Sequence, residues 1–385
     1  MTTTLEAPVR APQKPDTTTK APVPAAGVLD IGANGQGFLR AADLTPTSHD
    51  VQVPASLIRQ LGLRKGDLVT GLCGRPHTLA QVETVGGAPA AAIRHRPRFA
   101  DLTPLHPTER LRLEGSSGLA GRVVDLVAPV GKGQRGLIVA PPKTGKTVLL
   151  QQIAASVATH HPDTHLMVVL LDERPEEVTD MRRSVRGEVY ASTFDRPAKA
   201  HIALAELAVE RAKRLVEQGR DVVILLDSLT RLCRAHNNAA ASGGRALSGG
   251  VDAAAVLGPK RLFGAARNTE ESGSLTILAT ALVDTGSRAD DYFFEELKGT
   301  GNMELRLDRV LSDRRVYPAV DITPSGTRRE ELLVPADELA AVRGLRRALQ
   351  GRDGHASYEA LLDKMRHTPD NAAFLRQVHR TVPGA

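Results

Sequence analysis

The sequence contains few aromatic residues and almost no cysteine. Tryptophan is absent, aromatic residues make up 3% of the 385 positions, and only Cys73 and Cys233 carry thiols. A core of this composition must consist mostly of Ala, Val, Leu and Ile. The two cysteines lie far apart, without a CxxC pair or a histidine cluster beside them, which argues against a metal site and a disulfide framework. We expect both thiols to fill small apolar sites in a reducing compartment.

Long apolar runs are missing as well. The longest, such as residues 166–171, are far too short to span a bilayer. The N-terminus has no apolar segment of the kind found in secretory signals. These absences predict a cytoplasmic protein without a membrane partner. The formal charge of +6 suits an anionic partner, but many proteins are mildly basic, so charge alone is a weak indication.

The N-terminal part of the chain has the pattern of a small barrel behind a tail. Residues 1–26 are rich in Thr, Pro and Ala, which predicts a disordered tail. Within residues 27–100, five short β-forming runs alternate with Gly, Asn and Asp turns. A short helix is expected from Pro54 to Leu61, with Gly62 as its C-cap. Five short strands in so few residues favour an OB-fold.

The rest of the chain alternates apolar strands with helical patterns. A polar, Pro-rich linker is expected at residues 101–121. Apolar runs such as residues 136–140 predict strands buried on both faces of a parallel sheet. With the helical patterns between them they form the βαβ signature of a doubly wound core, assigned to residues 122–335. Residues 336–385 predict a C-terminal helical subdomain. The predicted fold class is α/β.

One motif in the larger region indicates a specific chemistry. The segment from Ala140 to Thr147 is APPKTGKT, which follows a predicted strand and opens a predicted helix. It departs from the GxxxxGK[ST] phosphate loop only in its first residue. In such a loop Lys146 reaches the β- and γ-phosphates, and the Thr147 hydroxyl ligates Mg²⁺. The sequence therefore predicts a P-loop ATPase with ATP and Mg²⁺ as cofactors.

Hydrolysis also needs carboxylates. Asp227 ends the apolar run VVILLD, the usual position of a Walker-B carboxylate that holds Mg²⁺ through water. A second carboxylate must orient or deprotonate the attacking water. Asp172 and Glu173 both follow the apolar strand at residues 166–171, on the edge where α/β folds bind ligands. The pattern alone does not choose between them.

Several long runs resemble the Rho family of transcription termination factors. They include LLDERPEEVTDMRRSVRGEVYASTFD at 170–195, GLIVAPPKTGKT at 136–147 and PKRLFGAARN at 259–268. The resemblance extends from Gly27 to about residue 350. It implies an OB-fold RNA-binding domain ahead of a RecA-like P-loop motor in a homo-hexameric ring. Such a ring binds single-stranded RNA, acts as an ATP-dependent 5′–3′ helicase, and releases the transcript from RNA polymerase.

The resemblance implies roles for residues of the nucleotide site. Glu173 is the water-activating carboxylate, Tyr317 stacks on adenine, and Arg328 is an arginine finger for the neighbouring subunit. Without the surrounding SGTRREEL, a solvated surface arginine would be the better interpretation of Arg328. The predicted catalytic residues are Lys146, Glu173, Asp227 and Arg328. The predicted ATP-binding residues are Gly131, Lys132, Gly133, Gln134, Arg135, Gly136, Lys143, Thr144, Gly145, Lys146, Thr147, Val148, Arg174 and Tyr317.

Two loops are expected to hold RNA in the central pore of the ring. One is SGGRALSGG at 242–250. The other is DTGSR at 284–288, which ends in arginine where the family usually has lysine, so the positive charge is kept. Their glycine-rich composition alone would favour two flexible surface loops. The predicted pore residues are Arg245, Ala246, Arg288 and Lys298.

The resemblance is weakest at the primary RNA site in the barrel. Phe38 is retained, but Gln36 and Gln52 stand where the family usually has Phe and Tyr. One stacked base is typically worth ~1–3 kcal/mol, so the loss of two aromatics should weaken RNA binding. The predicted residues of the site are Gly35, Gln36, Gly37, Phe38, Leu39, Arg40, Asp50, Val51 and Gln52. The remaining attraction is expected to be electrostatic, and therefore salt-sensitive, from Arg40, Arg59, Arg64, Lys65 and the 94–98 cluster.

Two alternative functions stay open. The weakened primary site favours a specialised Rho paralogue with an altered RNA preference. The second alternative is a non-catalytic regulator that co-assembles with another Rho. The intact Glu173, Asp227 and Arg328 argue against this alternative. RecA-like recombinases and rotary ATP synthase subunits are expected to share only the phosphate loop with this chain.

Overall fold

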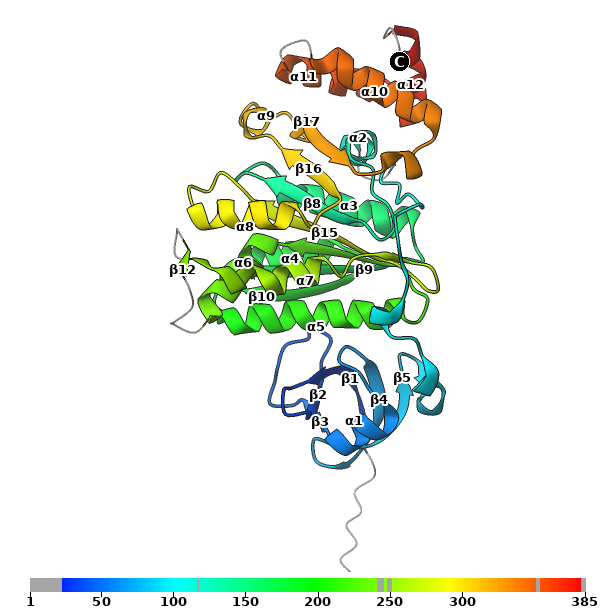
Figure 1. Ribbon diagram of the computed structural model, residues 1–385, viewed down its shortest axis with the longest axis vertical. Coiled ribbons are helices and arrows are strands. Elements are labelled where there is room, and N and C mark those ends of the chain that lie inside the picture. The colour runs from blue at the N-terminus through cyan, green and yellow to red at the C-terminus, as the bar shows by residue number, and fades with distance from the viewer. Residues whose placement is uncertain (1–22, 116–117, 241–245, 248–250, 351–353, 382–385) are drawn as a thin grey trace, which may run out of the picture.

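The structure is a computed structural model that describes residues 23–115, 118–240, 246–247, 251–350 and 354–381. The described chain has three parts along its longest axis (Figure 1). The N-terminal barrel lies at one end, the large α/β domain lies in the middle, and the C-terminal helices lie at the other end. None of the described helices is long and apolar enough to cross a membrane.

The N-terminal part is a closed barrel, as its short β-forming runs predict. Its elements are β1 (Val23–Ile31), β2 (Gly37–Arg40), β3 (Val51–Val53), α1 (Ala55–Leu61), β4 (Leu68–Arg75), β5 (Thr78–Val85) and β6 (Ala88–Pro89). The strand order is β3-β2-β1-β4-β5-β6, and a pairing between β3 and β5 closes the sheet. Helix α1 ends at Gly62, whose φ is +63° and whose N–H bonds the carbonyls of Ile58 and Arg59, so the expected C-cap is confirmed.

The barrel begins earlier than the sequence suggested. Val23 pairs with Cys73 of β4, and the pairing continues residue by residue to Val28 and Leu68. Residues 23–26 therefore belong to the barrel and not to the N-terminal tail, so the tail boundary at residue 26 was wrong. The remainder of that tail, residues 1–22, lies outside the described part of the chain.

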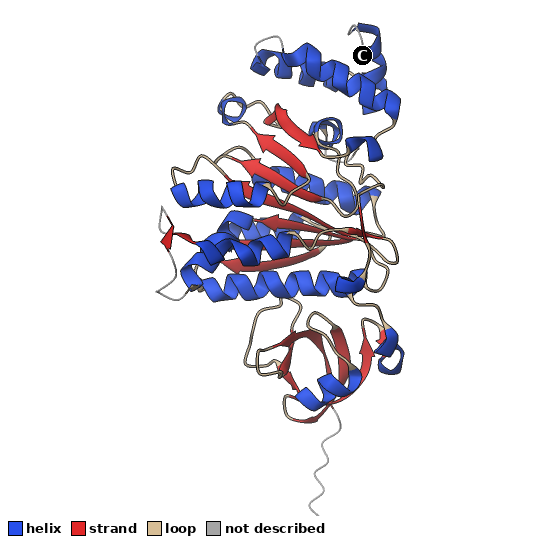
Figure 2. Cartoon of the chain, in the orientation of Figure 1, coloured by secondary structure: helices blue, strands red, loops and turns tan. Residues whose placement is uncertain are grey.

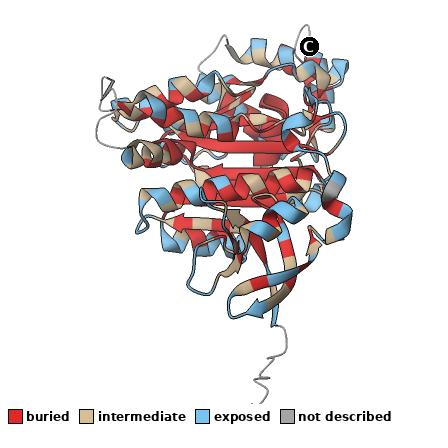
Figure 3. Ribbon diagram, turned by 60° about the horizontal axis from the view of Figure 1, so that its bottom comes forward, coloured by how far each residue is buried: buried red, intermediate tan, exposed pale blue. Residues whose placement is uncertain are grey.

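The central domain is one twisted sheet of seven strands, parallel except for its last strand. In sheet order these are β10 (Glu188–Thr193), β9 (His165–Glu173), β11 (Val222–Asp227), β15 (Leu275–Leu282), β8 (Arg135–Ala140), β16 (Met303–Leu307) and β17 (Val320–Thr327). Helices cover both of its faces (Figure 2). All six residues of β11 are buried, and buried residues follow the strands throughout the sheet (Figure 3). The apolar runs in the sequence thus mark strands buried on two sides.

One helix of the central domain precedes the sheet, and the others lie between its strands. They are α2 (Leu119–Val127), α3 (Lys146–His160), α4 (Pro175–Ser184), α5 (Ala198–Val216), α6 (Leu229–Ala239), α7 (Leu257–Phe263), α8 (Arg288–Lys298) and α9 (Arg309–Asp313). Short elements complete it: η2 (Phe99–Asp101), β7 (Pro104–Leu105), β12 (Ala246–Leu247), β13 (Val251–Asp252), η3 (Ala253–Val256), β14 (Asn268–Thr269) and η4 (Glu330–Leu332). Between the barrel and η2 lies η1 (Ala90–His95).

The expected linker and the C-terminal helices share the core of the central domain. Leu111 and Leu113 of the linker are each 1% exposed and belong to the apolar cluster beneath the sheet. Helices α10 (Ala336–Gln350), α11 (Gly354–Arg366) and α12 (Asn371–Thr381) add Tyr358 and Phe374 to the same cluster. Arg122 of α2 donates hydrogen bonds to the turn between α11 and α12. These parts therefore pack as one body with the motor.

The barrel is attached to α5 by buried ionic contacts. Arg64 of the barrel lies 3.0 Å from Glu217, whose side chain is 1% exposed. The other oxygen of Glu217 accepts a hydrogen bond of 2.7 Å from the Phe99 N–H. Leu44, in the loop after β2, is buried in the apolar cluster of the motor. Because breaking a buried charge pair is costly, these contacts fix the barrel against the motor.

Candidate nucleotide and RNA sites

The phosphate loop lies where three parallel strands end. It connects the last residue of β8, Ala140, to the first residue of α3, Lys146. Glu173 ends β9 and Asp227 ends β11, so both carboxylates lie at the same edge of the sheet as the loop. Parallel strands bring their carboxyl ends together, which explains why residues so distant in sequence converge here.

Lys146 joins the two carboxylates. Its Nζ lies 2.5 Å from Oδ1 of Asp227 and 3.4 Å from Oε1 of Glu173. The Thr280 hydroxyl donates a further hydrogen bond of 2.8 Å to Asp227. Asp227 is 1% exposed and Glu173 is 3% exposed, so these charges act in a largely water-excluded setting. The structure thus brings together three of the four predicted catalytic residues.

The structure also distinguishes Glu173 from its neighbour Asp172. Glu173 points at Lys146, whereas the side chain of Asp172 is 39% exposed and lies 4.0 Å from Arg231. Burial and the negative charge of Asp227 raise the pKa of Glu173, and the cations Lys146 and Arg231 work in the opposite direction. A carboxylate with a raised pKa is a stronger base, which suits the activation of water.

Arg231 is a site residue that sequence analysis did not find. It lies on α6, and its Nη1 is 3.2 Å from Oε1 of Glu173. The same guanidinium donates to the backbone carbonyls of Leu171 and Asp172. Arg231 therefore fixes the end of β9 and orients its carboxylate. Its position four residues after Asp227, in the helix that starts at this edge, was the available signal.

Tyr317 lies against the phosphate loop from the side of α9. Gly145 has φ +83°, and a Cβ there would lie 3.2 Å from Cε1 of Tyr317. The Tyr317 hydroxyl is 3.1 Å from Oγ of Ser312, which donates a bond of 2.7 Å to the carbonyl of Lys143. Tyr317 is 42% exposed beside the loop, which suits the platform for adenine that the resemblance to Rho implies. Val148 and Arg174, also predicted to bind ATP, are exposed at this edge.

The donor set of the site fits Mg²⁺. The ion prefers hard oxygen ligands and usually combines one or two protein groups with water and phosphate oxygens. Thr147, in the first turn of α3, and Asp227, at the end of β11, supply a hydroxyl and a carboxylate at one edge of the sheet. Among the described residues, no group of three or more His, Cys, Asp or Glu could hold a metal without such additional ligands.

The segment Gly131–Gly136 lies away from this edge. Arg135 opens β8 and Ala140 closes it, so the segment and the phosphate loop are at opposite ends of a six-residue strand, at about 3.3 Å per residue. Gln134 donates 2.7 Å to Oδ1 of Asn302, and Lys132 lies 2.8 Å from Asp221. Within one chain, the segment therefore lies away from the pocket of the phosphate loop, although its residues are predicted to bind ATP.

Arg328 lies at the same distant edge. It follows Thr327, which pairs with Met303, and Met303 in turn pairs with Gly136 at the start of β8. Arg328 is exposed and borders a pocket of about 300 Å³. Burial, with the charges of Arg267 and Arg328 nearby, lowers the pKa of Arg135, so these cations share one region. The guanidinium of Arg328 is thus separated from the phosphate loop of its own chain.

The predicted pore residues do not all lie together. Arg288 and Lys298 are the first and last residues of α8, an 11-residue helix that rises about 1.5 Å per residue. Both are exposed, but Lys298 borders the pocket of Arg328. Grouping it with Arg288 is therefore not supported by the geometry. Ala246 lies in β12, and Arg245 is outside the described residues.

The segments that flank the two predicted pore loops are tied to α6. Arg234 of α6 lies 2.5 Å from Asp290 in the first turn of α8, and Asp290 is fully buried. Asn237 of the same helix accepts a bond of 2.8 Å from the N–H of Asp252, which follows residues 242–250. Because α6 begins directly after Asp227, both loops are mechanically connected to the nucleotide edge.

The barrel face with the predicted primary RNA site is internally paired. Phe38 and Gln52 are neighbours on β2 and β3, and both are half-buried. Arg40 lies 2.7 Å from Asp30 and 2.5 Å from Asp50, and its guanidinium lies 5.4 Å from the centre of the Phe38 ring. Its hydrogen bonds to both aspartates raise the pKa of Arg40 although burial opposes this.

Several barrel residues differ from their expected roles. Leu39 is 3% exposed and faces the barrel core, and a Cβ at Gly37 would collide with Leu29 and Ile58, so neither offers a side chain to RNA. Gln36 is exposed and bonded to Asn34, 3.2 Å away. Four cations expected to attract RNA are instead paired with carboxylates: Arg40, Arg64, Lys65 and Arg96. The expectation of strongly charge-driven binding therefore loses most of its basis.

Comparison with known proteins identifies both domains. The RNA-binding domain of the Rho termination factor matches residues 25–91, and the nucleotide-binding domain of the ATP synthase alpha/beta family matches residues 120–327. The transcription termination factor Rho of Streptomyces coelicolor is 69% identical over 384 residues, covering 100% of this chain and 91% of that protein. The chain belongs to the transcription termination factor Rho family. The Rho of Streptosporangium roseum is 61% identical, covering 93% of this chain and 92% of its own length.

Solved structures agree with the fold of the Rho motor. An ATPase of the type III secretion system of pathogenic bacteria superposes with a TM-score of 0.60 at 21% identity, over 72% of this chain and 86% of that one. The assembled ATPase EscN of enteropathogenic E. coli gives 0.60 at 20% identity, over 80% and 79%. Together with the family match at 120–327, this corrects the expectation that rotary ATPase subunits share only the phosphate loop.

The Rho assignment carries function as well as fold. This chain is a Rho-type transcription termination factor with an RNA-binding barrel and an ATPase motor. Neither the specialised paralogue nor the non-catalytic regulator is favoured by these comparisons. The departures at Gln36 and Gln52 are therefore differences within a Rho protein.

Proposed function

We propose that the chain forms a cytoplasmic homo-hexameric ring that hydrolyses ATP, moves 5′–3′ along single-stranded RNA as a helicase and releases the transcript from RNA polymerase. One observation supports assembly into a ring. Lys146, Glu173 and Asp227 converge at the carboxyl edge of the sheet, whereas Arg328 lies at the opposite edge of the same chain. A complete set of catalytic charges at one ATP thus requires two chains, arranged head to tail around a ring.

Each ATP site in this arrangement combines residues of two neighbouring chains. Lys146 binds the β- and γ-phosphates, and Glu173 accepts the proton of the attacking water. Thr147 and Asp227 would hold Mg²⁺, which would supply positive charge against the phosphates. Arg328 of the next chain approaches the γ-phosphate, and such a finger is typically worth ~10³–10⁵ in rate. Gly131–Gly136 lies at the edge of Arg328, so we infer that it, too, faces the neighbouring nucleotide.

Helix α6 couples the nucleotide site to the predicted RNA-binding loops. The helix starts at the Walker-B edge, and its Arg234 and Asn237 hold the bases of the two pore loops. A change at Asp227 on hydrolysis is thereby passed to Arg288, which we propose grips a phosphate of the RNA. The barrel holds the same RNA upstream with a single aromatic platform, Phe38.

The test is ATP turnover of the purified protein, alone and with poly(C), poly(U) or single-stranded DNA. We expect turnover to rise strongly with RNA and little with DNA, and the mass of the active species to be that of six chains. Release of a transcript from stalled RNA polymerase in the presence of ATP checks termination itself. Full turnover by a single-chain species without RNA would contradict the proposal.

A further inference from the structure

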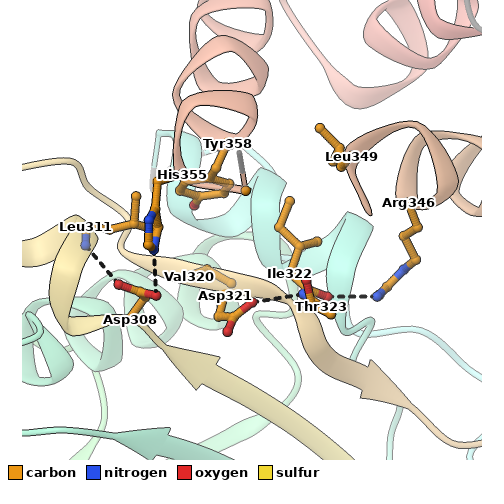
Figure 4. Close-up of a pocket in the computed structure, with 11 residues that line it drawn as sticks. Asp308, Leu311, Val320, Asp321, Ile322, Thr323, Arg346, Leu349, His355 and Tyr358 are labelled. Carbon is orange, nitrogen blue, oxygen red and sulfur yellow. Dashed lines mark hydrogen bonds and ion pairs between the residues drawn. The ribbon is translucent and has the colours of Figure 1, made fainter. Parts of the chain in front are cut away.

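Helix α11 contacts the segment that carries Tyr317. Tyr358 of α11 is 2% exposed, and its hydroxyl donates a hydrogen bond of 2.5 Å to the carbonyl of Pro318, directly after Tyr317. The same carbonyl also accepts a bond of 3.0 Å from the Val320 N–H. One turn before Tyr358, His355 lies 3.2 Å from Oδ2 of Asp308 (Figure 4). Both contacts join the C-terminal helices to the region around α9.

Asp308 transmits the second contact to α9. Its Oδ1 accepts a hydrogen bond of 2.8 Å from the Leu311 N–H and thereby caps the helix (Figure 4). Helix α9 has only five residues. A helix this short is not stable by itself, so its position depends on its tertiary contacts. The bond to His355 fixes the capping carboxylate and, through it, the start of α9.

Helix α9 and the segment after it contact the phosphate loop. Ser312 is 4% exposed, bonds the Lys143 carbonyl at 2.7 Å, and meets the Tyr317 hydroxyl at 3.1 Å. A continuous path of hydrogen bonds therefore leads from His355 through Asp308 and α9 to the loop. Tyr358 acts at the other end of the same segment, beside Tyr317.

Apolar packing alone does not hold this segment. A pocket of about 100 Å³ lies between β17 and helices α9, α10 and α11, lined by Leu311, Ile322 and Leu349 among others (Figure 4). A pocket of this volume admits water, so the apolar side chains that line it lack protein atoms on that side. The hydrogen bonds of His355 and Tyr358 therefore carry more of the task of fixing α9 than they would in a filled core.

We propose that Tyr358 and His355 are positioning residues of the nucleotide site, which hold α9 so that Tyr317 and the Lys143 carbonyl lie where ATP binds. The proposal rests on the proposed role of Tyr317 as the platform for adenine. Tyr358 and His355 contact Pro318 and Asp308, and α9 bridges the remaining distance to the phosphate loop. The C-terminal helices thereby serve ATP affinity as well as stability.

The test compares steady-state ATP hydrolysis of Tyr358→Phe, His355→Gln and wild type in the assembled protein. Loss of one hydrogen bond is expected to raise KM for ATP about 2- to 10-fold, with kcat within about twofold. Tyr190→Phe is the matched control, because Tyr190 is equally buried and its hydroxyl bonds Glu188 on the edge strand β10. It should leave KM unchanged. Thermal unfolding of each variant is recorded to check that it is folded. If Tyr358→Phe does not fold, His355→Gln alone provides the test.

A second comparison separates positioning from general loosening. In a Tyr317→Ala background, Tyr358→Phe should add less than about twofold to KM, because residues that act through one another are not additive. The inference would be overturned if KM stayed unchanged in both Tyr358→Phe and His355→Gln. It would also be overturned if Tyr358→Phe raised KM as much in the Tyr317→Ala background as in wild type, or if Tyr190→Phe raised KM equally. Wild-type protein that neither binds nor hydrolyses ATP would overturn the proposed function, and the inference with it.

Discussion

The nucleotide edge and the RNA face of the barrel both hold paired charges, but in different structural settings. At the nucleotide edge, Lys146, Glu173 and Asp227 point at one another from different elements, around the place where phosphates bind. On the barrel face, Arg40 already has two carboxylate partners and covers Phe38. Both sets of charges are paired within the chain, but only Lys146 stands on a phosphate loop, where bound phosphates would compete with its two carboxylates.

This difference shows which kinds of site a sequence motif can predict. A phosphate loop requires certain residues at fixed places on strand ends, so its chemistry follows from the sequence. An arginine on a barrel strand has no such constraint. Asp30 lies opposite Phe38 on β1, and Asp50 precedes β3, so only the folded barrel reveals that Arg40 is paired. A basic residue is thus predicted to bind phosphate in one region, whereas in the other it is part of the scaffold.

The largest effect is expected from Glu173→Gln. Loss of the base should lower ATP turnover about 10²–10⁴-fold while ATP binding remains, because Lys146 still contacts the phosphates. A steady-state assay measures the rate of ATP hydrolysis, and an equilibrium titration with ATP measures the affinity. Asp172→Asn, at the exposed neighbouring position, is the control and should retain most activity. Equal losses in both variants would show that the base has been misassigned.

The next effect is expected from Arg288→Ala. If Arg288 grips RNA, the variant should keep unstimulated ATP turnover but lose most of the stimulation by poly(C), about tenfold or more. The rate is measured as a function of RNA concentration. Arg366→Ala, which removes an exposed arginine from the end of α11, should leave stimulation unchanged. A normal response to RNA in Arg288→Ala would count against the pore assignment.

A smaller effect is expected from restoring aromatics to the barrel. Replacing Gln36 by Phe and Gln52 by Tyr should tighten oligo(C) binding at least about fivefold, since each stack is typically worth ~1–3 kcal/mol. Fluorescence titration of the full chain measures it. Because Arg40, Arg64, Lys65 and Arg96 are paired with carboxylates, we expect unmodified binding to be weak and only mildly salt-sensitive.

The control for the barrel variant adds aromatics elsewhere. Gln60 on α1 and Gln81 on β5 are both exposed and lie off the face of Phe38. Changing them to Phe and Tyr should leave affinity unchanged. Tight, C-selective binding by the unmodified chain would show instead that Gln36 and Gln52 contact base edges.

The smallest effect concerns stability and not activity. Burial raises the pKa of Asp125 to about 6, although Arg110 and the N–H groups of Glu114 and Leu113 oppose this. The folded state therefore binds this proton more tightly than the unfolded state, and the resulting stability is lost as pH rises from about 4 through 6. Relative to Asp125→Asn, wild type should gain about 1 kcal/mol between pH 7 and 5, measured by urea unfolding. A constant difference would contradict it.

The fold was predictable because its signals are local. Apolar runs marked the buried strands, Gly62 marked the end of α1, and the phosphate loop marked the β8–α3 junction. The choice of Glu173 over Asp172 agrees with the resemblance to Rho, but spacing alone did not make it. The structure separates the two residues by burying Glu173 and leaving the side chain of Asp172 exposed.

The remaining features depended on three-dimensional placement. Gly131–Gly136 is close to the phosphate loop in sequence, yet a strand separates them. Arg231 had no motif and became visible only when α6 brought it to Glu173. Lys298 was predicted as a pore residue together with Arg288, whereas the length of α8 separates the two.

The ring is tested most directly by mixing two inactive variants. Glu173→Gln lacks the base and Arg328→Ala lacks the finger, and each alone should show almost no RNA-stimulated ATP turnover. In rings assembled from equal amounts, about a quarter of interfaces join an intact Glu173 to an intact Arg328 of the next chain, by random mixing. We predict that the co-assembled mixture regains a substantial part of wild-type turnover. A mixture that forms mixed rings and stays inactive would contradict the shared site.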